Sequence, residues 1–148
     1  MDIRIAAYGV IIRDGQILLA HWNEHGRSGW TLPGGGVDGA EHPVQAAARE
    51  ILEETGYEAS IDRLLGIDTM VVPAAKRHTG RVPLYAMRIV YRASVVSGEL
   101  RNEIGGSSDE ARWFPLDQVP GLKRVSLLDI ALRLNAEEPA DGVPRAEP

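Results

Sequence analysis

The chain has 148 residues, no cysteine and a formal net charge of −5, with 16 Lys and Arg against 21 Asp and Glu. This length and the 44% hydrophobic content predict one compact domain with a single core. Without cysteine, disulfides, thiolate zinc sites and iron–sulfur clusters are excluded, so a bound metal would need oxygen or imidazole ligands. The acidic charge disfavours nucleic-acid binding, which depends on clustered lysines and arginines.

The N-terminal third predicts a β-hairpin, a glycine-rich loop and a helix. Residues 3–12 are rich in Ile, Val, Tyr and Ala, and Asp14-Gly15 provides a turn before the apolar run resumes. A short strand, WTLP, leads into three consecutive glycines, where we expect a loop. Residues 43–55 begin with a proline, continue with strong helix formers and end at Gly56, which predicts a helix.

The rest of the chain predicts further strands, a loop and a second helix. Residues 64–72 and 84–97 have the composition of strands, and a glycine- and serine-rich loop occupies residues 98–112. Apolar residues at spacings of three and four predict an amphipathic helix over 122–134 that covers a mixed sheet. The fold class is therefore α/β. We expect a single domain over residues 1–135 and a disordered tail over 136–148.

Our expectation for the location of the protein depends on two signals that its sequence lacks. No apolar run reaches the length that spans a membrane. The start, MDIRIAAYGV, has no basic segment, long apolar segment or cleavage site typical of a secretory signal. We therefore expect a cytoplasmic protein with neither membrane nor nucleic acid as a partner.

Three glutamates of the predicted helix give the first indication of chemistry. At 100° per residue, Glu50, Glu53 and Glu54 fall within an arc of about 100°, away from the apolar side of the helix. Like charges at these spacings destabilise a helix by roughly 0.2–0.5 kcal/mol per pair, and a divalent cation among them would reverse that effect. Carboxylate oxygens are ligands that Mg²⁺ prefers. The alternative for this segment alone is a solvated acidic face.

The glycines before this helix allow the backbone to approach a phosphate or a metal closely. A plain tight turn is the alternative interpretation. Gly34, Gly36 and Gly39 also match the dinucleotide-binding pattern GxGxxG, but Pro33 precedes them and the helix begins only at Pro43. The context that this pattern needs is therefore missing. No Gly-Lys-Ser/Thr follows the glycines, which excludes a P-loop.

The glycines and glutamates belong to one longer pattern between Gly35 and Tyr57. A glycine, five residues and a glutamate are followed by seven residues, Arg-Glu, Ile, any residue, Glu-Glu, any residue, glycine and tyrosine. This pattern resembles the Nudix box, from which it departs mildly in the aromatic Tyr57. The resemblance extends through WTLPGGG, RWFPLDQVP and the closing helix, and so covers roughly residues 3–135.

The resemblance to Nudix hydrolases implies an α/β/α sandwich around a mixed sheet, and hydrolysis of a nucleoside diphosphate linked to another group. It implies Mg²⁺ as the cofactor, with Mn²⁺ as a substitute. By the same resemblance, Glu50, Glu53 and Glu54 are the metal ligands. Arg49 is similar to the residue that orients a neighbouring glutamate, and Glu41 to the glutamate that supports this arrangement.

Hydrolysis of a pyrophosphate bond requires neutralised oxygen charge and a water molecule that a carboxylate deprotonates. We assign this base to Glu53 and further catalytic roles to Arg49 and Glu50. The resemblance also implies a carboxylate from a later loop, for which Asp109 and Glu110 are the candidates. Solvated loop charges are the alternative interpretation of these two residues.

The expected substrate is a small nucleotide. Arg27 lies in the loop before the glycines, and we assign it to substrate binding together with Gly35. Trp22 and Trp30 flank the same loop and either stack on a base or pack in the core. Pro73, sixteen residues beyond the box, resembles the mark of ADP-ribose pyrophosphatases.

We therefore expect ADP-ribose or a nucleotide sugar as the substrate. Two alternatives stay open. One is a nucleoside triphosphate pyrophosphohydrolase, and the other is a Nudix-like module that binds a nucleotide without hydrolysing it. The family resemblance is also compatible with a homodimer.

Overall fold

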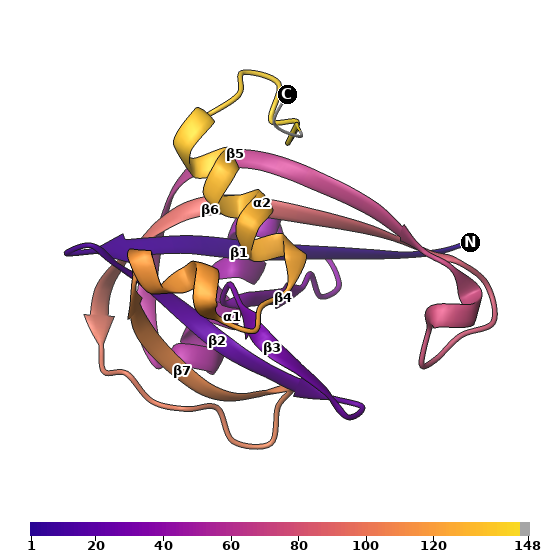
Figure 1. Ribbon diagram of the computed structural model, residues 1–148, viewed down its shortest axis with the longest axis horizontal. Coiled ribbons are helices and arrows are strands. Elements are labelled where there is room, and N and C mark those ends of the chain that lie inside the picture. The colour runs from indigo at the N-terminus through magenta and orange to yellow at the C-terminus, as the bar shows by residue number, and fades with distance from the viewer. Residues whose placement is uncertain (146–148) are drawn as a thin grey trace.

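The computed structural model describes residues 1–145, which form seven strands, two α-helices and two short 3₁₀ helices (Figure 1). In chain order the elements are β1 (Asp2–Arg13), β2 (Gln16–Glu24), β3 (Arg27–Thr31), β4 (Gly34–Gly36), α1 (Pro43–Thr55), β5 (Tyr57–Val72), η1 (Ala74–Lys76), β6 (Leu84–Gly98), β7 (Ser108–Pro115), η2 (Leu116–Gly121) and α2 (Ser126–Glu137). No helix among these residues is long and apolar enough to cross a membrane.

The strands form one mixed sheet in the order β3-β2-β1-β6-β5, with β4 paired to β1 and β7 paired to β2. β1 and β6 are parallel, while the other paired strands are antiparallel. The predicted hairpin is present, since Ile12 lies opposite Ile17 and the turn residues Asp14 and Gly15 both have positive φ. The α/β fold with a mixed sheet, as predicted from the sequence, is confirmed.

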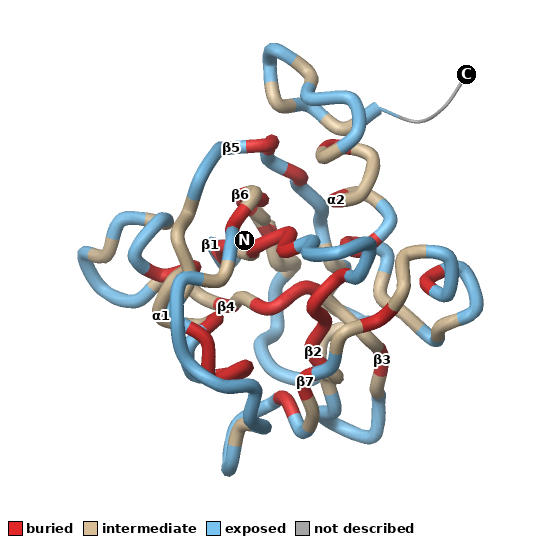
Figure 2. Tube along the Cα trace, turned by 90° about the vertical axis from the view of Figure 1, so that its left-hand side faces the viewer, coloured by how far each residue is buried: buried red, intermediate tan, exposed pale blue. Residues whose placement is uncertain are grey.

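The two helices cover opposite sides of the central strands, and the buried residues lie mainly between them (Figure 2). Alternate residues of β1 serve the two sides, as expected for an extended strand. Ala7 packs with Ala46 and Ala47 of α1, whereas Val10 belongs to the core that includes Leu128 of α2. The sandwich places β1 at the centre of the domain.

Helix α1 has the bounds that its sequence predicts. The His42 side chain accepts from Val44 N at 3.0 Å, and Gln45 Oε1 accepts from His42 N at 2.9 Å, which caps the first turn. Gly56 ends the helix with a φ of 81°, and its N–H donates to the Leu52 carbonyl. These local signals explain why the bounds of α1 could be predicted from the sequence.

Three strand boundaries differ from the predictions. The glycines expected to form a loop are strand β4, which pairs with residues 6–8 of β1. β5 begins at Tyr57 rather than at residue 64, because three register shifts between 58 and 66 disrupt the alternation that a strand normally shows. β7 begins at Ser108, inside the predicted loop of residues 98–112.

The C-terminal segment also differs from its prediction. Helix α2 continues to Glu137, and the backbone N–H of Ile67 in β5 donates to the Gly142 carbonyl at 2.8 Å. Glu138 forms an ion pair with Arg92 at 2.6 Å. Residues 136–145 therefore contact the domain where disorder was expected, while the last part of that prediction, residues 146–148, lies outside the described residues.

Candidate active site

The site begins where strand β4 approaches the C-terminal half of helix α1. A Cβ atom at Gly35 would lie 2.7 Å from the Glu50 carboxylate carbon, so only glycine leaves room for this carboxylate. At Gly34 the φ of 153° favours glycine, and a Cβ atom would lie 2.3 Å from the Ala7 carbonyl oxygen. The glycines thus bring the β4 backbone into contact with the glutamates of α1.

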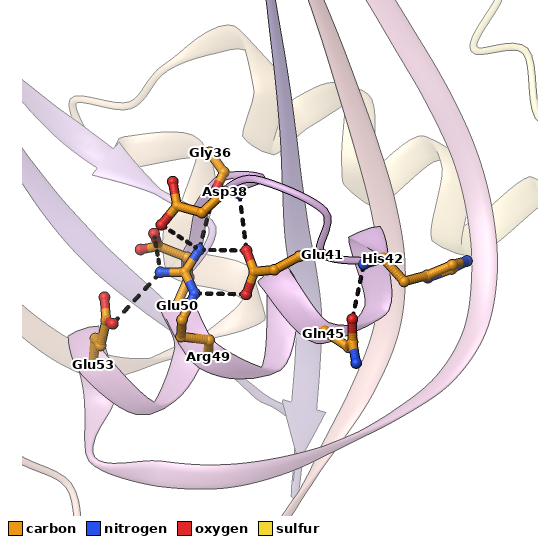
Figure 3. A network of polar contacts seen from close by, with 8 residues as sticks. All are labelled: Gly36, Asp38, Glu41, His42, Gln45, Arg49, Glu50 and Glu53. Carbon is orange, nitrogen blue, oxygen red and sulfur yellow. Dashed lines mark hydrogen bonds and ion pairs between the residues drawn. The ribbon is translucent and has the colours of Figure 1, made fainter.

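Arg49 holds several of the predicted site residues together (Figure 3). Its Nε and Nη2 donate to the two Glu41 oxygens at 2.8 and 2.9 Å, and Nη2 also donates to the Gly36 carbonyl at 3.0 Å. Nη1 donates to Glu50 Oε1 at 3.0 Å and to Glu53 Oε1 at 3.5 Å. A planar guanidinium can make such contacts in several directions at once. Arg49 therefore holds the Glu50 carboxylate by a hydrogen bond, and the role that the family resemblance implies for Arg49 stays a prediction.

Glu41 is fixed from two directions. Besides Arg49, the backbone N–H of Asp38 donates to Glu41 Oε1 at 2.9 Å. The hydrogen bonds from Arg49 and from Asp38 lower the pKa of Glu41 to about 2. Glu41 is thus ionised throughout the neutral range and keeps Arg49 in place.

Glu54 is the buried member of the glutamate set, with 5% of its surface exposed. Its Oε1 accepts from Gly34 N at 3.1 Å and its Oε2 accepts from Ser108 Oγ at 2.9 Å. Burial raises the pKa of Glu54 to about 8, and the negative charges of Glu50 and Glu103 add to this effect, while the two hydrogen bonds oppose it. A buried carboxylate of this kind favours a nearby positive charge.

Ser108 and Glu103 are site residues that the sequence did not reveal. Glu103 lines a hollow of about 570 Å³ that also involves Glu53. Burial raises the pKa of Glu103, and the charges of Glu50 and Glu53 raise it further. A single serine or glutamate in a Gly/Ser-rich loop has no sequence signal of its own, so only the folded chain shows these neighbours.

The two loop acids expected from the resemblance have other partners. Asp109 Oδ1 lies 2.7 Å from His21 Nδ1, and Asp109 Oδ2 accepts from Asn23 Nδ2 at 3.1 Å. These hydrogen bonds hold the pKa of Asp109 below its usual value. Glu110 accepts from Arg112 Nε at 2.8 Å. Within residues 1–145 neither acid forms a hydrogen bond or ion pair with the α1 glutamates, whereas Glu103 lines a hollow together with Glu53.

A cleft of about 480 Å³ extends from the glutamates between the strands, a size typical of small-molecule sites. Its lining combines backbone of the glycine strand with charged and aromatic side chains: Arg4, Tyr8, Trp22, Glu24, Thr31, Gly34, Gly35, Gly36, Glu50, Glu54, Arg88, Ser107, Ser108, Val125 and Leu127.

Of the residues assigned to substrate binding, Gly35 lines this cleft and Arg27 does not. Arg27 is exposed at the first position of β3, opposite Glu24 in the hairpin. Trp22 lines the cleft, whereas Trp30 packs against Phe114 with ring centroids 4.6 Å apart. Each of the two interpretations thus applies to one tryptophan. Trp30 packs in the core, and Trp22 faces the cleft.

The glutamates suit a hard cation by their chemistry, because all the donors are oxygen atoms. Within residues 1–145 no three acidic or histidine side chains converge in a ready-made metal site. The reason is visible in the contacts, since Arg49 holds Glu50 and Glu53 while Glu54 turns towards Gly34. Metal binding would therefore require these carboxylates to exchange existing hydrogen bonds for the metal, and Glu54, whose pKa burial raises to about 8, would also lose its proton.

Known proteins share both the sequence pattern and the fold. The NUDIX domain family matches residues 3–132. The chain is 33% identical over 119 residues to an ADP-ribose pyrophosphatase of Methanocaldococcus jannaschii, covering 80% of this chain and 65% of that protein. For the next two curated relatives the match covers 51% and 40% of their lengths, so the chain corresponds to only part of these proteins.

Two solved structures have the same architecture. A NUDIX hydrolase from Nitrosomonas europaea has a TM-score of 0.77 at 22% identity, with 91% of this chain and 89% of that chain covered. A MutT NUDIX hydrolase from Burkholderia pseudomallei has a TM-score of 0.71 at 30% identity, with 89% and 97% covered. The complete glycine and glutamate pattern, its position on α1 and these likenesses agree, and the chain belongs to the Nudix family.

Proposed function

We propose that the protein hydrolyses the pyrophosphate bond of a nucleoside diphosphate linked to another group. The observation that carries this proposal is the position of Glu50 and Glu54 beside the backbone of Gly34–Gly36 at one end of a nucleotide-sized cleft. Acidic side chains are poor partners for an anionic diphosphate unless a cation accompanies it. The site therefore suits a substrate that binds together with a divalent metal.

The residues that would hold this metal are Glu50, Glu53 and Glu54, and we propose Mg²⁺, with Mn²⁺ as a substitute. When bound, the metal neutralises charge on the phosphate oxygens and lowers the pKa of a coordinated water. Arg49 keeps Glu50 directed towards the glycine strand through the contacts described above. Gly35 leaves the space in which the Glu50 carboxylate lies.

We assign the proton acceptor to Glu53. Its side chain is 52% exposed, in contrast to Glu54, and it lies at the hollow that the loop of residues 101–106 borders. A base must reach a water molecule that attacks from the solvent side of the diphosphate, and exposure gives Glu53 that access. Glu103 is the second carboxylate at this hollow, and we propose it as the later loop acid that the family resemblance implies.

We propose ADP-ribose or a nucleotide sugar as the preferred substrate. The relative named as an ADP-ribose pyrophosphatase and the position of Pro73 support this choice. Trp22 supplies an aromatic surface in the cleft for a nucleobase. Pro73 itself precedes the 3₁₀ helix η1 and is not among the residues that line the cleft, so its support comes from the family pattern alone.

The experiment is a panel of ADP-ribose, nucleotide sugars, canonical and oxidised dNTPs, and dinucleoside polyphosphates, measured as kcat/KM in Mg²⁺. AMP and ribose 5-phosphate as preferred products support the proposal. A dNTP converted to dNMP and pyrophosphate with a hundredfold higher kcat/KM would overturn the substrate choice. Stabilisation by ADP-ribose without turnover of any compound would instead indicate a binding module.

A further inference from the structure

Arg4 carries a positive charge in the cleft, where Glu24 and Glu50 are the nearest acidic influences but form no ion pair with it. It lies near the start of β1, on the same face as Tyr8 four residues later, and both line the cleft. Its Nη1 donates to the Tyr8 hydroxyl at 3.5 Å, the limit of a hydrogen bond. Within residues 1–145 Arg4 forms no ion pair, so its guanidinium retains donors for a ligand.

The other arginine of the cleft is already paired. Arg88 of β6 lies opposite Asp68 of β5, and its Nε donates to Asp68 Oδ2 at 3.0 Å while Nη2 contacts the same oxygen. The two side chains are only 13% and 12% exposed. Asp68 thus neutralises Arg88, and this pair forms a fixed part of the cleft wall.

The register of the strands places Arg4 beside the glycine strand. Ala6 pairs with Gly36, and Val37 N donates to the Ile5 carbonyl at 2.9 Å. Arg4 precedes these residues directly in β1, next to the end of the cleft at which Glu50 lies. The unpaired guanidinium and the carboxylate end of the cleft are therefore neighbours.

The charges of the cleft lining indicate which kind of ligand Arg4 can bind. The acids that line the cleft are Glu24, Glu50 and Glu54, and Glu24 accepts from Trp22 Nε1 at 3.0 Å. A bound diphosphate would add negative charge to this acidic cleft. The phosphate oxygens that point away from the carboxylates therefore need a positively charged partner. A guanidinium can donate to two such oxygens at once.

We propose that Arg4 binds the non-bridging oxygens of the substrate's diphosphate, a role that the sequence assigned to Arg27. The inference rests on the proposed function in that it takes a diphosphate compound as the ligand. Tyr8 positions the Arg4 side chain through its hydroxyl. Arg27 lies outside the cleft lining and is exposed at the β2–β3 hairpin, so it remains in contact with solvent.

The test compares Arg4→Gln and Arg4→Lys with Arg27→Gln as the matched control, using the preferred substrate of the panel. Loss of a charge-assisted hydrogen bond predicts a KM about 10- to 100-fold higher for Arg4→Gln, with kcat changed much less. Arg4→Lys should recover part of the loss, since lysine restores the charge without the planar fork. Arg27→Gln should stay within about twofold of wild type, as expected for an exposed surface residue. Wild-type KM in Arg4→Gln, or an equal loss in Arg27→Gln, would overturn the inference.

Binding of α,β-methylene-ADP, which resists hydrolysis, separates this inference from the proposed function. Calorimetry in Mg²⁺ should show weaker binding by Arg4→Gln than by wild type, while AMP, which has one phosphate, should lose less affinity. If the wild type hydrolyses no diphosphate but the analogue still depends on Arg4, the inference holds and the proposed function fails. If diphosphates are hydrolysed and bound equally well by Arg4→Gln, the inference alone fails.

Discussion

The Arg49 guanidinium and the Glu41 carboxylate form a two-point ion pair, with Nε 2.8 Å from Oε2 and Nη2 2.9 Å from Oε1. This pair fixes the plane of the guanidinium and leaves Nη1 directed at Glu50. Glu41, the first glutamate of the Nudix pattern, is thus linked to Glu50 through Arg49. Its carboxylate contacts Arg49 and the Asp38 backbone N–H.

Glu41→Gln should make the stability of the protein depend less on pH in the acid range. The hydrogen bonds from Arg49 and Asp38 lower the pKa of Glu41 to about 2 in the folded protein, against about 4.3 in an unfolded chain. Its contribution to stability is therefore complete above about pH 5 and is lost as the pH falls towards 2. Thermal unfolding of wild type and variant at pH 7, 5, 4 and 3 measures this. The difference in Tm should be constant from pH 7 to 5 and shrink below, and a difference that grows on acidification would contradict the assignment.

Gly35→Ala should impair activity far more than Gly36→Ala. A Cβ atom at Gly35 would lie 2.7 Å from the Glu50 carboxylate carbon, whereas a Cβ atom at Gly36 has nothing within 4 Å. Displacing the Glu50 carboxylate by about 1 Å is expected to lower kcat/KM about 10²-fold. Both variants should unfold near the wild-type temperature, because the Glu50 side chain can move. Equal kcat/KM for the two variants would show that this close approach does not matter.

Mg²⁺ should raise the Tm relative to EDTA, because it offsets the repulsion among Glu50, Glu53 and Glu54. Glu54→Gln should keep the Tm in EDTA within a few degrees but lose most of the shift. Glu137→Gln, an exposed position of α2, is the matched control and should keep the full shift. If wild type melts at the same temperature in Mg²⁺ and in EDTA, these carboxylates do not bind the metal.

Removal of residues 139–148 should lower the Tm by about 2–4 °C. The truncation deletes the Gly142 carbonyl that accepts from Ile67 N, and a hydrogen bond contributes about 1 kcal/mol net. Removal of residues 146–148 alone is the control, which retains this contact. Calorimetry of the three chains decides the point. An unchanged Tm after removal of residues 139–148 would show that this segment contributes nothing to stability.

Local signals explain which parts of the fold the sequence predicts. Helix α1 was predicted with its observed bounds, because proline at its start and Gly56 at its end act within one turn. The start of β5 was missed, because its register shifts disrupt the alternation of buried and exposed residues. The short strand β4 has no side chains at all, so its pairing with β1 is visible only in the fold.

The same distinction holds for the site. Glu50, Glu53 and Glu54 share one helix, and their spacing predicts a shared face. Ser108 and Glu103 come from a segment about fifty residues away, and the packing of β7 against β2 brings Ser108 to Glu54. The sequence does not distinguish Arg4 from Arg27 as a phosphate-binding residue, whereas in the fold Arg4 lines the cleft and Arg27 lies on the β2–β3 hairpin.

The measurement that tests the central claim most directly is kcat for ADP-ribose hydrolysis in Mg²⁺, for wild type, Glu53→Gln and Glu54→Gln. Each substitution replaces a carboxyl group by an amide of similar volume, so the far-ultraviolet spectrum and the Tm in EDTA should stay near wild type. We predict measurable turnover by wild type and a reduction of about 10²- to 10⁴-fold in each variant. Wild-type turnover in both variants would contradict the assignment of these glutamates to a metal-dependent hydrolase site.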